Sequence, residues 1–183
     1  MSFIGNNHGI LCSEELIGDD EIDGRNSVPM SSWNDRDRWS ALCSGQACPI
    51  CRQGEPLDLL ANLEASWLTM GEAAPLRGYV CLVSRIHAVE LHDLEESAAC
   101  AFMRDARRVS SAVAFITGAV KMNYEIHGNS IPHLHMHFFP RHRGDQFEGQ
   151  PINPRVAVQP VYASGEFERM RSALLVALGS GVA

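Results

Sequence analysis

The sequence has no long apolar run and no excess of positive charge, and each absence excludes a class of protein. A membrane-spanning helix needs about 20 consecutive apolar residues, and every apolar run in this chain of 183 residues is far shorter. The formal net charge is −7, which argues against non-specific nucleic-acid binding because that mode of binding needs a basic face. We therefore expect neither a membrane span nor strong nucleic-acid binding.

The N-terminal stretch, residues 1–23, also lacks the features of a secretory signal peptide. It has no basic start and no apolar core followed by a small-residue cleavage site. We therefore expect a cytoplasmic protein, in which the six cysteines remain reduced. Under those conditions a close Cys-x-x-Cys pair binds metal or takes part in catalysis more often than it forms a disulfide.

Three histidines alternate with apolar residues within residues 132–141, and this segment is the most informative part of the sequence. Side chains on a strand point to opposite faces with period two, so His133, His135 and His137 are expected to share one face. Neighbouring positions on that face lie about 6–7 Å apart. Imidazoles ligate metals, transfer protons and attack electrophiles. A strict row of three favours a functional site over a surface patch, and a metal site made by the three alone stays open here.

A second motif, Cys-Pro-Ile-Cys at residues 48–51, brings two thiols within reach of one tetrahedral zinc ion. A redox pair is the alternative interpretation. Redox pairs stand at a strand-to-helix junction, however, and the residues after Cys51 do not have the pattern of a helix start. A zinc site needs two further ligands besides Cys48 and Cys51.

The remaining pattern predicts an α+β fold. Strands are expected over residues 63–70, 78–84 and 121–126 and over the triad segment, with the first two forming an antiparallel hairpin. The strand at 78–84 is apolar enough to be buried on both faces. A long helix is expected from Leu94 to Thr117, capped by Asp93 and ended by Gly118. Its apolar residues recur every three to four positions, and a closing helix is expected over residues 166–178.

The length suggests one domain with extensions. We divide the chain into an N-terminal extension, partly ordered, at 1–42, a central domain at 43–145, and a C-terminal segment with the closing helix at 146–183. Residues 1–38 are acidic and turn-rich, and are expected to be loosely structured. Trp33 and Trp39 indicate that residues 30–45 pack on the domain or on a partner subunit.

The stretch His-Leu-His-Met-His-Phe-Phe at residues 133–139 resembles the signature of the histidine triad superfamily of nucleotide hydrolases and transferases. Residues 123–132 resemble the lead-in of that family, with Asn129 where glutamine is usual. The likeness covers roughly residues 48–141. It implies an antiparallel sheet with one long helix packed on it, and a homodimer. It also implies hydrolysis or transfer of a nucleoside monophosphate at the α-phosphorus, through a covalent nucleotidyl-histidine.

The resemblance assigns roles to residues. His135 would be the nucleophile, and His137 would act as hydrogen-bond donor or acid beside the transferred phosphoryl group. Attack needs an unprotonated nitrogen, so we expect an acceptor, usually a backbone carbonyl, to hold the other nitrogen of His135. The turn before the triad would supply donors to the phosphate oxygens. The substrate-binding candidates are Asn123, Asn129, Ser130 and Glu72.

Zinc-containing members of the superfamily use a Cys-x-x-Cys pair, a histidine after the second strand and the first triad histidine. By position, this implies a structural zinc site formed by Cys48, Cys51, His87 and His133. The candidate substrates are dinucleoside polyphosphates, nucleoside phosphoramidates and adenylated conjugates. Two alternatives remain: a nucleotide-binding or scaffold protein with little turnover, and a hydrolase with catalytic zinc.

Overall fold

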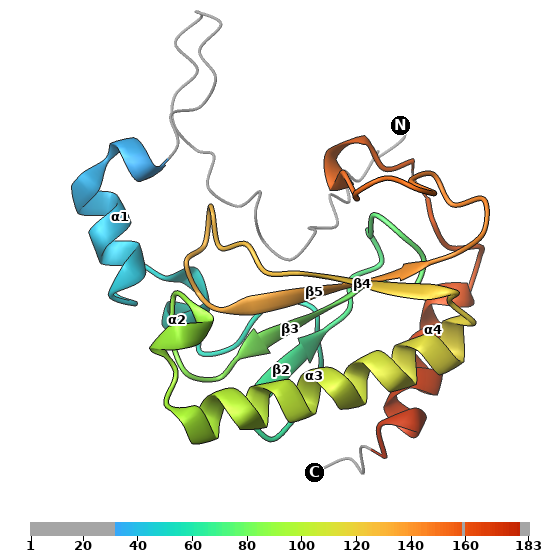
Figure 1. Ribbon diagram of the computed structural model, residues 1–183, viewed down its shortest axis with the longest axis horizontal. Helices are drawn as coiled ribbons and strands as arrows, with labels where there is room; N and C mark the ends of the chain where they lie inside the picture. The colour runs from blue at the N-terminus through green and yellow to red at the C-terminus, as the bar shows by residue number, and fades with distance from the viewer. Residues whose placement is uncertain (1–31, 159, 180–183) are drawn as a thin grey trace, which may run out of the picture.

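A five-stranded antiparallel sheet forms the centre of the protein, as the computed structural model shows for residues 32–158 and 160–179. The strand order is β1-β2-β3-β5-β4, so the triad strand lies between the central strand and an edge strand. Figure 1 shows α3 and α4 together on one side of this sheet. The strands are β1 (Leu59–Asn62), β2 (Ser66–Thr69), β3 (Val80–Ser84), β4 (Lys121–Glu125) and β5 (His135–Arg141).

Four α-helices accompany the sheet within the described residues. They are α1 (Arg36–Cys43), α2 (Pro49–Gln53), α3 (Glu96–Thr117) and α4 (Glu166–Ala177). The long helix α3 buries Phe102, Ala106, Val109 and Val113 at the predicted spacing of three to four residues. It ends at Gly118, whose φ of 67° is the left-handed conformation typical of a helix C-terminus. Among the described helices, none is both long and apolar enough to cross a bilayer.

The register of the sheet separates an apolar face from a polar one. Met136 and Phe138 are 5% and 0% exposed and belong to the core, together with Leu82, which pairs with Met136 across β3 and β5. His135 and His137 alternate with these residues and therefore point to the opposite face. β3 is buried along its whole length, as the sequence predicts. The fold is thus the expected antiparallel sheet with one long helix packed on it.

The strand predicted over residues 63–70 is shorter than expected, because only Ser66–Thr69 form β2. A tight turn at residues 63–65 joins it to β1 (Leu59–Asn62), a strand that was not predicted. The turn is held from a distance by the buried carboxylate of Asp105 on α3. Its Oδ2 accepts hydrogen bonds from the Ala65 backbone N–H at 2.8 Å and from the Ser66 hydroxyl at 2.6 Å. Because the acceptor lies about 40 positions away in the chain, the local pattern does not reveal this turn.

The predicted start of the long helix is also wrong. Asp93 does not cap α3, which begins at Glu96 after an extended Glu95. The Asp93 carboxylate instead accepts a hydrogen bond from the backbone N–H of Glu90 at 2.9 Å, within a short 3-10 turn over residues 91–93. Asp93 is therefore a capping residue, but it caps the 3-10 turn that precedes α3 and not α3 itself.

Two short helices appear where none was predicted. Residues 36–38, expected to be loose, belong to α1, whose N-cap Asp35 accepts a hydrogen bond from the backbone N–H of Arg38 at 3.0 Å. The Cys-Pro-Ile-Cys motif opens α2, with Pro49 at the first helical position. The indole N–H of Trp33 donates to the carbonyl oxygen of Asn129 at 2.9 Å. This part of the N-terminal extension therefore packs on the domain, while residues 1–31 lie outside the described residues.

Candidate active site and metal centre

Only two of the three triad histidines lie on the strand. β5 begins at His135, and the preceding His133 sits in a bend whose backbone N–H donates to the carbonyl of Ile131 at 2.8 Å. The rings of His135 and His137 remain neighbours, with centroids 4.8 Å apart. The expectation that all three histidines stand in one strand is therefore wrong for His133, whose ring approaches a different set of side chains.

His133 lies in a cluster with Cys48, Cys51 and His87, the four residues implied by the family resemblance. Their ligand atoms all lie within 4.8 Å of one another. The Nδ1 atom of His133 is 3.4 Å from the sulfur of Cys48 and 3.6 Å from that of Cys51. The Nδ1 atom of His87 is 3.3 Å from the Cys51 sulfur and 3.2 Å from the Nδ1 of His133. Three segments remote in sequence thus converge on one point.

These distances fit the edges of a tetrahedron around a single ion. Metal–sulfur bonds of about 2.3 Å and metal–nitrogen bonds of about 2.0–2.1 Å place nitrogen atoms about 3.4 Å apart, and nitrogen and sulfur about 3.5 Å apart. Both rings are also oriented by their second nitrogen. The Nε2–H of His87 donates to the carbonyl of Cys43 at 2.9 Å, and that of His133 to the carbonyl of Ser84 at 2.8 Å. Both Nδ1 lone pairs then face the sulfur atoms, as in metal sites with backbone-anchored histidines.

The electrostatics of the cluster also suit a cation. Burial lowers the pKa of His133 to about 4, so its ring is neutral and can ligate. Burial and, after it, the neighbouring Cys48 raise the pKa of Cys51 to about 11, because burial and repulsion from Cys48 both disfavour its thiolate. A divalent cation between them offsets that repulsion. The four residues could therefore bind a metal ion.

His135, the candidate nucleophile, is 4% exposed and its tautomer is defined by the backbone. Its Nδ1 lies 2.7 Å from the carbonyl oxygen of His133, which accepts a hydrogen bond from the Nδ1–H. A neutral imidazole with its proton on Nδ1 carries a lone pair on Nε2. The backbone carbonyl expected from the sequence is thus present, and it belongs to the candidate metal ligand two residues earlier.

His137 is held by Tyr79, a residue that the sequence analysis did not single out. The Tyr79 hydroxyl lies 2.7 Å from the Nδ1 of His137, and the two rings are stacked with centroids 6.0 Å apart. Burial, followed by the nearby His135 and His127, lowers the pKa of His137 to about 3. The ring is therefore neutral, and a Tyr79 hydroxyl that donates to Nδ1 leaves the proton of His137 on Nε2. The only signal in the sequence is position. Tyr79 lies two residues before Cys81, which pairs with His137, so side chains alternating along β3 place Tyr79 on the face of His137.

The structure places the four substrate-binding candidates in different surroundings. Asn129 and Ser130 follow Gly128, whose φ of 89° gives the turn a backbone conformation that side chains disfavour. Asn123 lies on β4, where its Oδ1 accepts a hydrogen bond from Arg141 at 2.7 Å. Glu72 is exposed in the loop between β2 and β3. Burial raises the pKa of Tyr162 in the C-terminal segment, and the charge of Glu72 makes a small contribution to that rise.

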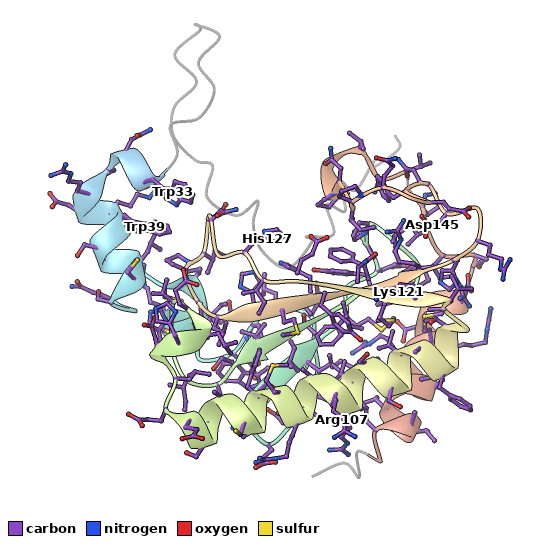
Figure 2. The ribbon with its side chains drawn as sticks, viewed as in Figure 1. Trp33, Trp39, Arg107, Lys121, His127 and Asp145 are labelled. Carbon is purple, nitrogen blue, oxygen red and sulfur yellow. The ribbon has the colours of Figure 1, made fainter. Side chains whose placement is uncertain are left out.

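Another histidine adjoins the triad. Glu125 on β4 pairs directly with His137 on β5, so the two side chains share one face of the sheet. The Nε2 of His127 is 2.9 Å from the Oε2 of Glu125, and its ring centroid is 5.7 Å from that of His137. Figure 2 shows His127 above the β4–β5 pair, on the side away from α3. Nothing in the sequence pattern marks this pair as functional, although Glu125 falls on the polar side of the period-two alternation of β4.

Comparison with known proteins agrees with this geometry. The family model of the HIT domain, named for the histidine triad, matches residues 58–144. The solved structure of a histidine triad protein from Bradyrhizobium japonicum is 30% identical, with a TM-score of 0.59. The alignment covers 66% of this chain and 89% of that one. The chain belongs to the histidine triad family. Cys48 and Cys51 lie before the matched segment, so the candidate metal centre joins them to His87 and His133 inside the family domain.

Two further solved structures share the fold at lower identity. A zinc-bound histidine triad family protein from Mycobacterium smegmatis is 19% identical, with a TM-score of 0.51, and the match covers 77% of this chain and 91% of that one. A hypothetical histidine triad nucleotide-binding protein from Sulfolobus tokodaii is 16% identical, with a TM-score of 0.53, over 76% of this chain and 91% of that one. No curated protein matches the chain.

Proposed function

We propose that this histidine triad protein is a nucleotide hydrolase or nucleotidyl transferase that acts at an α-phosphorus through a covalent intermediate on His135. The observation that carries the proposal is the hydrogen bond from His135 Nδ1–H to the carbonyl of His133 at 2.7 Å. It fixes the tautomer whose Nε2 lone pair can attack phosphorus. Family membership supports nucleotide chemistry in general, and the tautomer supports this specific nucleophile.

The reaction proceeds in two displacements. The Nε2 lone pair of His135 forms a bond to the α-phosphorus while the bond from phosphorus to the leaving group breaks. The leaving group takes up a proton from an acid in the site or from solvent as it departs. Water, or an acceptor alcohol, then attacks the same phosphorus and the electron pair of the P–N bond returns to Nε2. His137, with its proton on Nε2, donates a hydrogen bond to the phosphoryl oxygens or the leaving group. The turn at residues 128–130 supplies N–H and hydroxyl donors to the same oxygens.

The substrates are conjugates with a nucleoside monophosphate on one side of the scissile bond. Dinucleoside polyphosphates, nucleoside phosphoramidates and adenylated conjugates all have this form. Asn123 is proposed as a further polar contact near the nucleotide, and Glu72 as the acidic partner of the ribose. The hydrogen bond from Arg141 already occupies one acceptor site on Asn123, and leaves its amide N–H groups to donate.

Cys48, Cys51, His87 and His133 are proposed to hold one structural zinc ion. The two thiolates and two neutral imidazoles form a donor set typical of zinc, and four protein ligands close the coordination sphere. When bound, the ion fixes the position of His133 and supplies no open site for water. This closed set argues against a hydrolase with catalytic zinc. The zinc-bound relative from Mycobacterium smegmatis agrees with this choice of metal.

The protein is also proposed to be a homodimer. β4 is an edge strand of the sheet, and an unpaired edge is a natural place for a second copy to bind. Two apolar side chains on β4 or directly before it are strongly exposed, Val120 at 60% and Tyr124 at 50%, and so is Phe115 near the end of α3 at 86%. Sedimentation equilibrium tests the proposal, and a protein that remains monomeric at about 100 μM, well above the micromolar Kd of a specific interface, would overturn it.

Intact-mass spectrometry tests the chemistry directly. The protein is mixed with an adenosine 5′-phosphoramidate, quenched with acid during turnover, and weighed. We expect an added adenylyl mass in the natural protein and in His92→Ala, whose exposed ring lies outside the site. The His135→Ala variant should gain no mass and release no leaving group. AMP binding without turnover or adduct would instead favour the second candidate, a nucleotide-binding protein that retains the pocket.

A further inference from the structure

The pair formed by Glu125 and His127 has the geometry of an acid–base dyad. The carboxylate lies 2.9 Å from the Nε2 of His127, and it therefore fixes the proton on that nitrogen. The other ring nitrogen, Nδ1, is then the atom that can exchange a proton with a ligand. A carboxylate on one ring nitrogen is also the arrangement in which an aspartate orients a catalytic histidine.

The dyad continues the row of imidazoles toward solvent. The centroid distances are 4.8 Å from His135 to His137 and 5.7 Å from His137 to His127. Exposure increases along the row, from 4% for His135 and 7% for His137 to 44% for the side chain of His127. A nucleotide attacked by His135 would thus meet His137 first, and its departing group would leave past His127.

His137, the buried neighbour of His127, is poorly suited to carry a proton. His137 remains neutral at physiological pH because burial disfavours its charged form. It can donate a hydrogen bond, but it is not a reservoir of protons for a leaving group that must depart protonated. His127 is partly exposed, can exchange protons with water, and has a carboxylate partner.

We propose that His127, oriented by Glu125, is a further catalytic residue that protonates the leaving group, with the inference resting on the proposed function. In the first displacement the Nδ1–H of the His127 imidazolium gives its proton to the leaving group as the bond to phosphorus breaks. His127 is then neutral, with Nε2–H still bound to Glu125. In the second displacement it takes a proton from the attacking water, which restores the imidazolium. The sum is one water consumed, one P–O bond formed and one protonated leaving group released.

A simple surface pair makes a different prediction from a catalytic dyad. An exposed ion pair contributes little to stability, and its loss would affect all substrates alike. Loss of a general acid lowers the reaction rate of a substrate, and the rate falls further the more basic the leaving group is. An alkylamine needs the proton, whereas 4-nitrophenolate departs without one. The comparison of two such substrates therefore separates acid catalysis from packing against His137.

The test measures single-turnover release of each leaving group from an alkylamine adenosine 5′-phosphoramidate and from adenosine 5′-(4-nitrophenyl phosphate). For His127→Gln we expect the rate with the alkylamine substrate to fall about 100-fold, within the usual range for general acid catalysis. The rate with the nitrophenyl ester should change less than about threefold by the same reasoning. Glu125→Gln should show the same selectivity with a smaller loss. His92→Gln is the matched control, since the His92 side chain is 83% exposed and lies beside a carboxylate, Asp93, at 3.8 Å.

An equal fall with both substrates, or no fall with either, overturns the dyad while the proposed function stands. The proposed function itself fails if the natural protein releases neither leaving group and gains no adenylyl mass, and the dyad then falls with it. Should His127→Gln not fold, Glu125→Gln carries the same test.

Discussion

The Nδ1 atom of His135 lies 2.7 Å from the backbone carbonyl oxygen of His133. His133 in turn contributes its own ring to the cluster with Cys48, Cys51 and His87. The candidate nucleophile is therefore oriented by the main chain of a candidate metal ligand. Any change that moves the backbone at His133 also alters the hydrogen bond that sets the tautomer of His135, so the candidate metal centre and the candidate nucleophile share this residue.

The first prediction concerns the metal centre. Cys48→Ser should lower the zinc bound per chain and reduce the stability of the fold, because structural zinc contributes several kcal/mol, and about 10–16 kcal/mol in zinc-finger peptides. Zinc content is measured by atomic emission and stability by thermal unfolding. Cys100→Ser is the matched control, because Cys100 is an exposed residue of α3 and is not part of the cluster. Full zinc content in Cys48→Ser would show that the ligand set is wrong.

The second prediction concerns Tyr79. Tyr79→Phe keeps the ring that packs on Phe139, with centroids 5.1 Å apart, but removes the hydroxyl that bonds to His137. We expect kcat to fall about tenfold, because loss of a buried hydrogen bond costs about 1–3 kcal/mol. KM should change little. Tyr124→Phe, on the opposite face of the sheet, is the control. An unchanged kcat in Tyr79→Phe would show that the Tyr79 hydroxyl has no role in the reaction.

The third prediction concerns pH. Burial, with the neighbouring His135 and His127, lowers the pKa of His137 to about 3 in the folded protein, while an unfolded histidine titrates near about 6.5. Below that pH the unfolded chain binds a proton that the folded protein does not, so stability declines as pH falls from about 6.5 toward 3.

This decline can be assigned to His137 by comparison with a variant. From pH 7 to pH 5 the natural protein should lose about 2 kcal/mol more stability than His137→Gln does. Urea unfolding at the two pH values measures the difference. The same metal ligands are present in both proteins, so metal loss at low pH affects both alike. Equal losses in the two proteins would mean that His137 is protonated in the folded state.

The fourth prediction concerns the turn between β1 and β2. Asp105→Ala removes the acceptor for the Ala65 N–H and the Ser66 hydroxyl. Since both donors are then left without their partner, stability should fall by about 2–3 kcal/mol. Glu168→Ala, an exposed change on α4, should alter stability by less than about 0.5 kcal/mol. Chemical denaturation measures both values, and a small effect at Asp105 would mean that water replaces its carboxylate.

The sequence predicted the parts of the fold that follow from local periodicity. The apolar spacing of Phe102, Val109 and Val113 gave helix α3, and Gly118 gave its end. The alternation around His135 and His137 gave the triad strand with two neighbouring rings on one face. Local periodicity did not predict the turn held by Asp105, the start of α3 or the bend at His133. Each of these depends on a hydrogen-bond partner that local spacing does not identify.

The candidate site divides in the same way. Residue type and family resemblance were enough to select Cys48, Cys51, His87 and His133, and the structure brings these four together. The division of the chain into 1–42, 43–145 and 146–183, and the roles of the substrate-binding residues, remain predictions. The sequence did not identify Tyr79 or the Glu125–His127 pair as functional, because a tyrosine near a strand and an exposed ion pair are common in proteins without a functional site.

By itself, the sequence determined which residues can carry the chemistry. Strand geometry places alternate residues on one face, and a two-residue spacing lets two cysteines reach one ion, so both patterns can be recognised without coordinates. Only the tertiary structure decided how the histidines differ. It turned His133 toward the sulfur atoms, fixed His135 through a carbonyl, and buried His137 against Tyr79. The physical reason is that tautomer and charge depend on the hydrogen-bond partner and the burial of each ring, and both are set by segments far away in the chain.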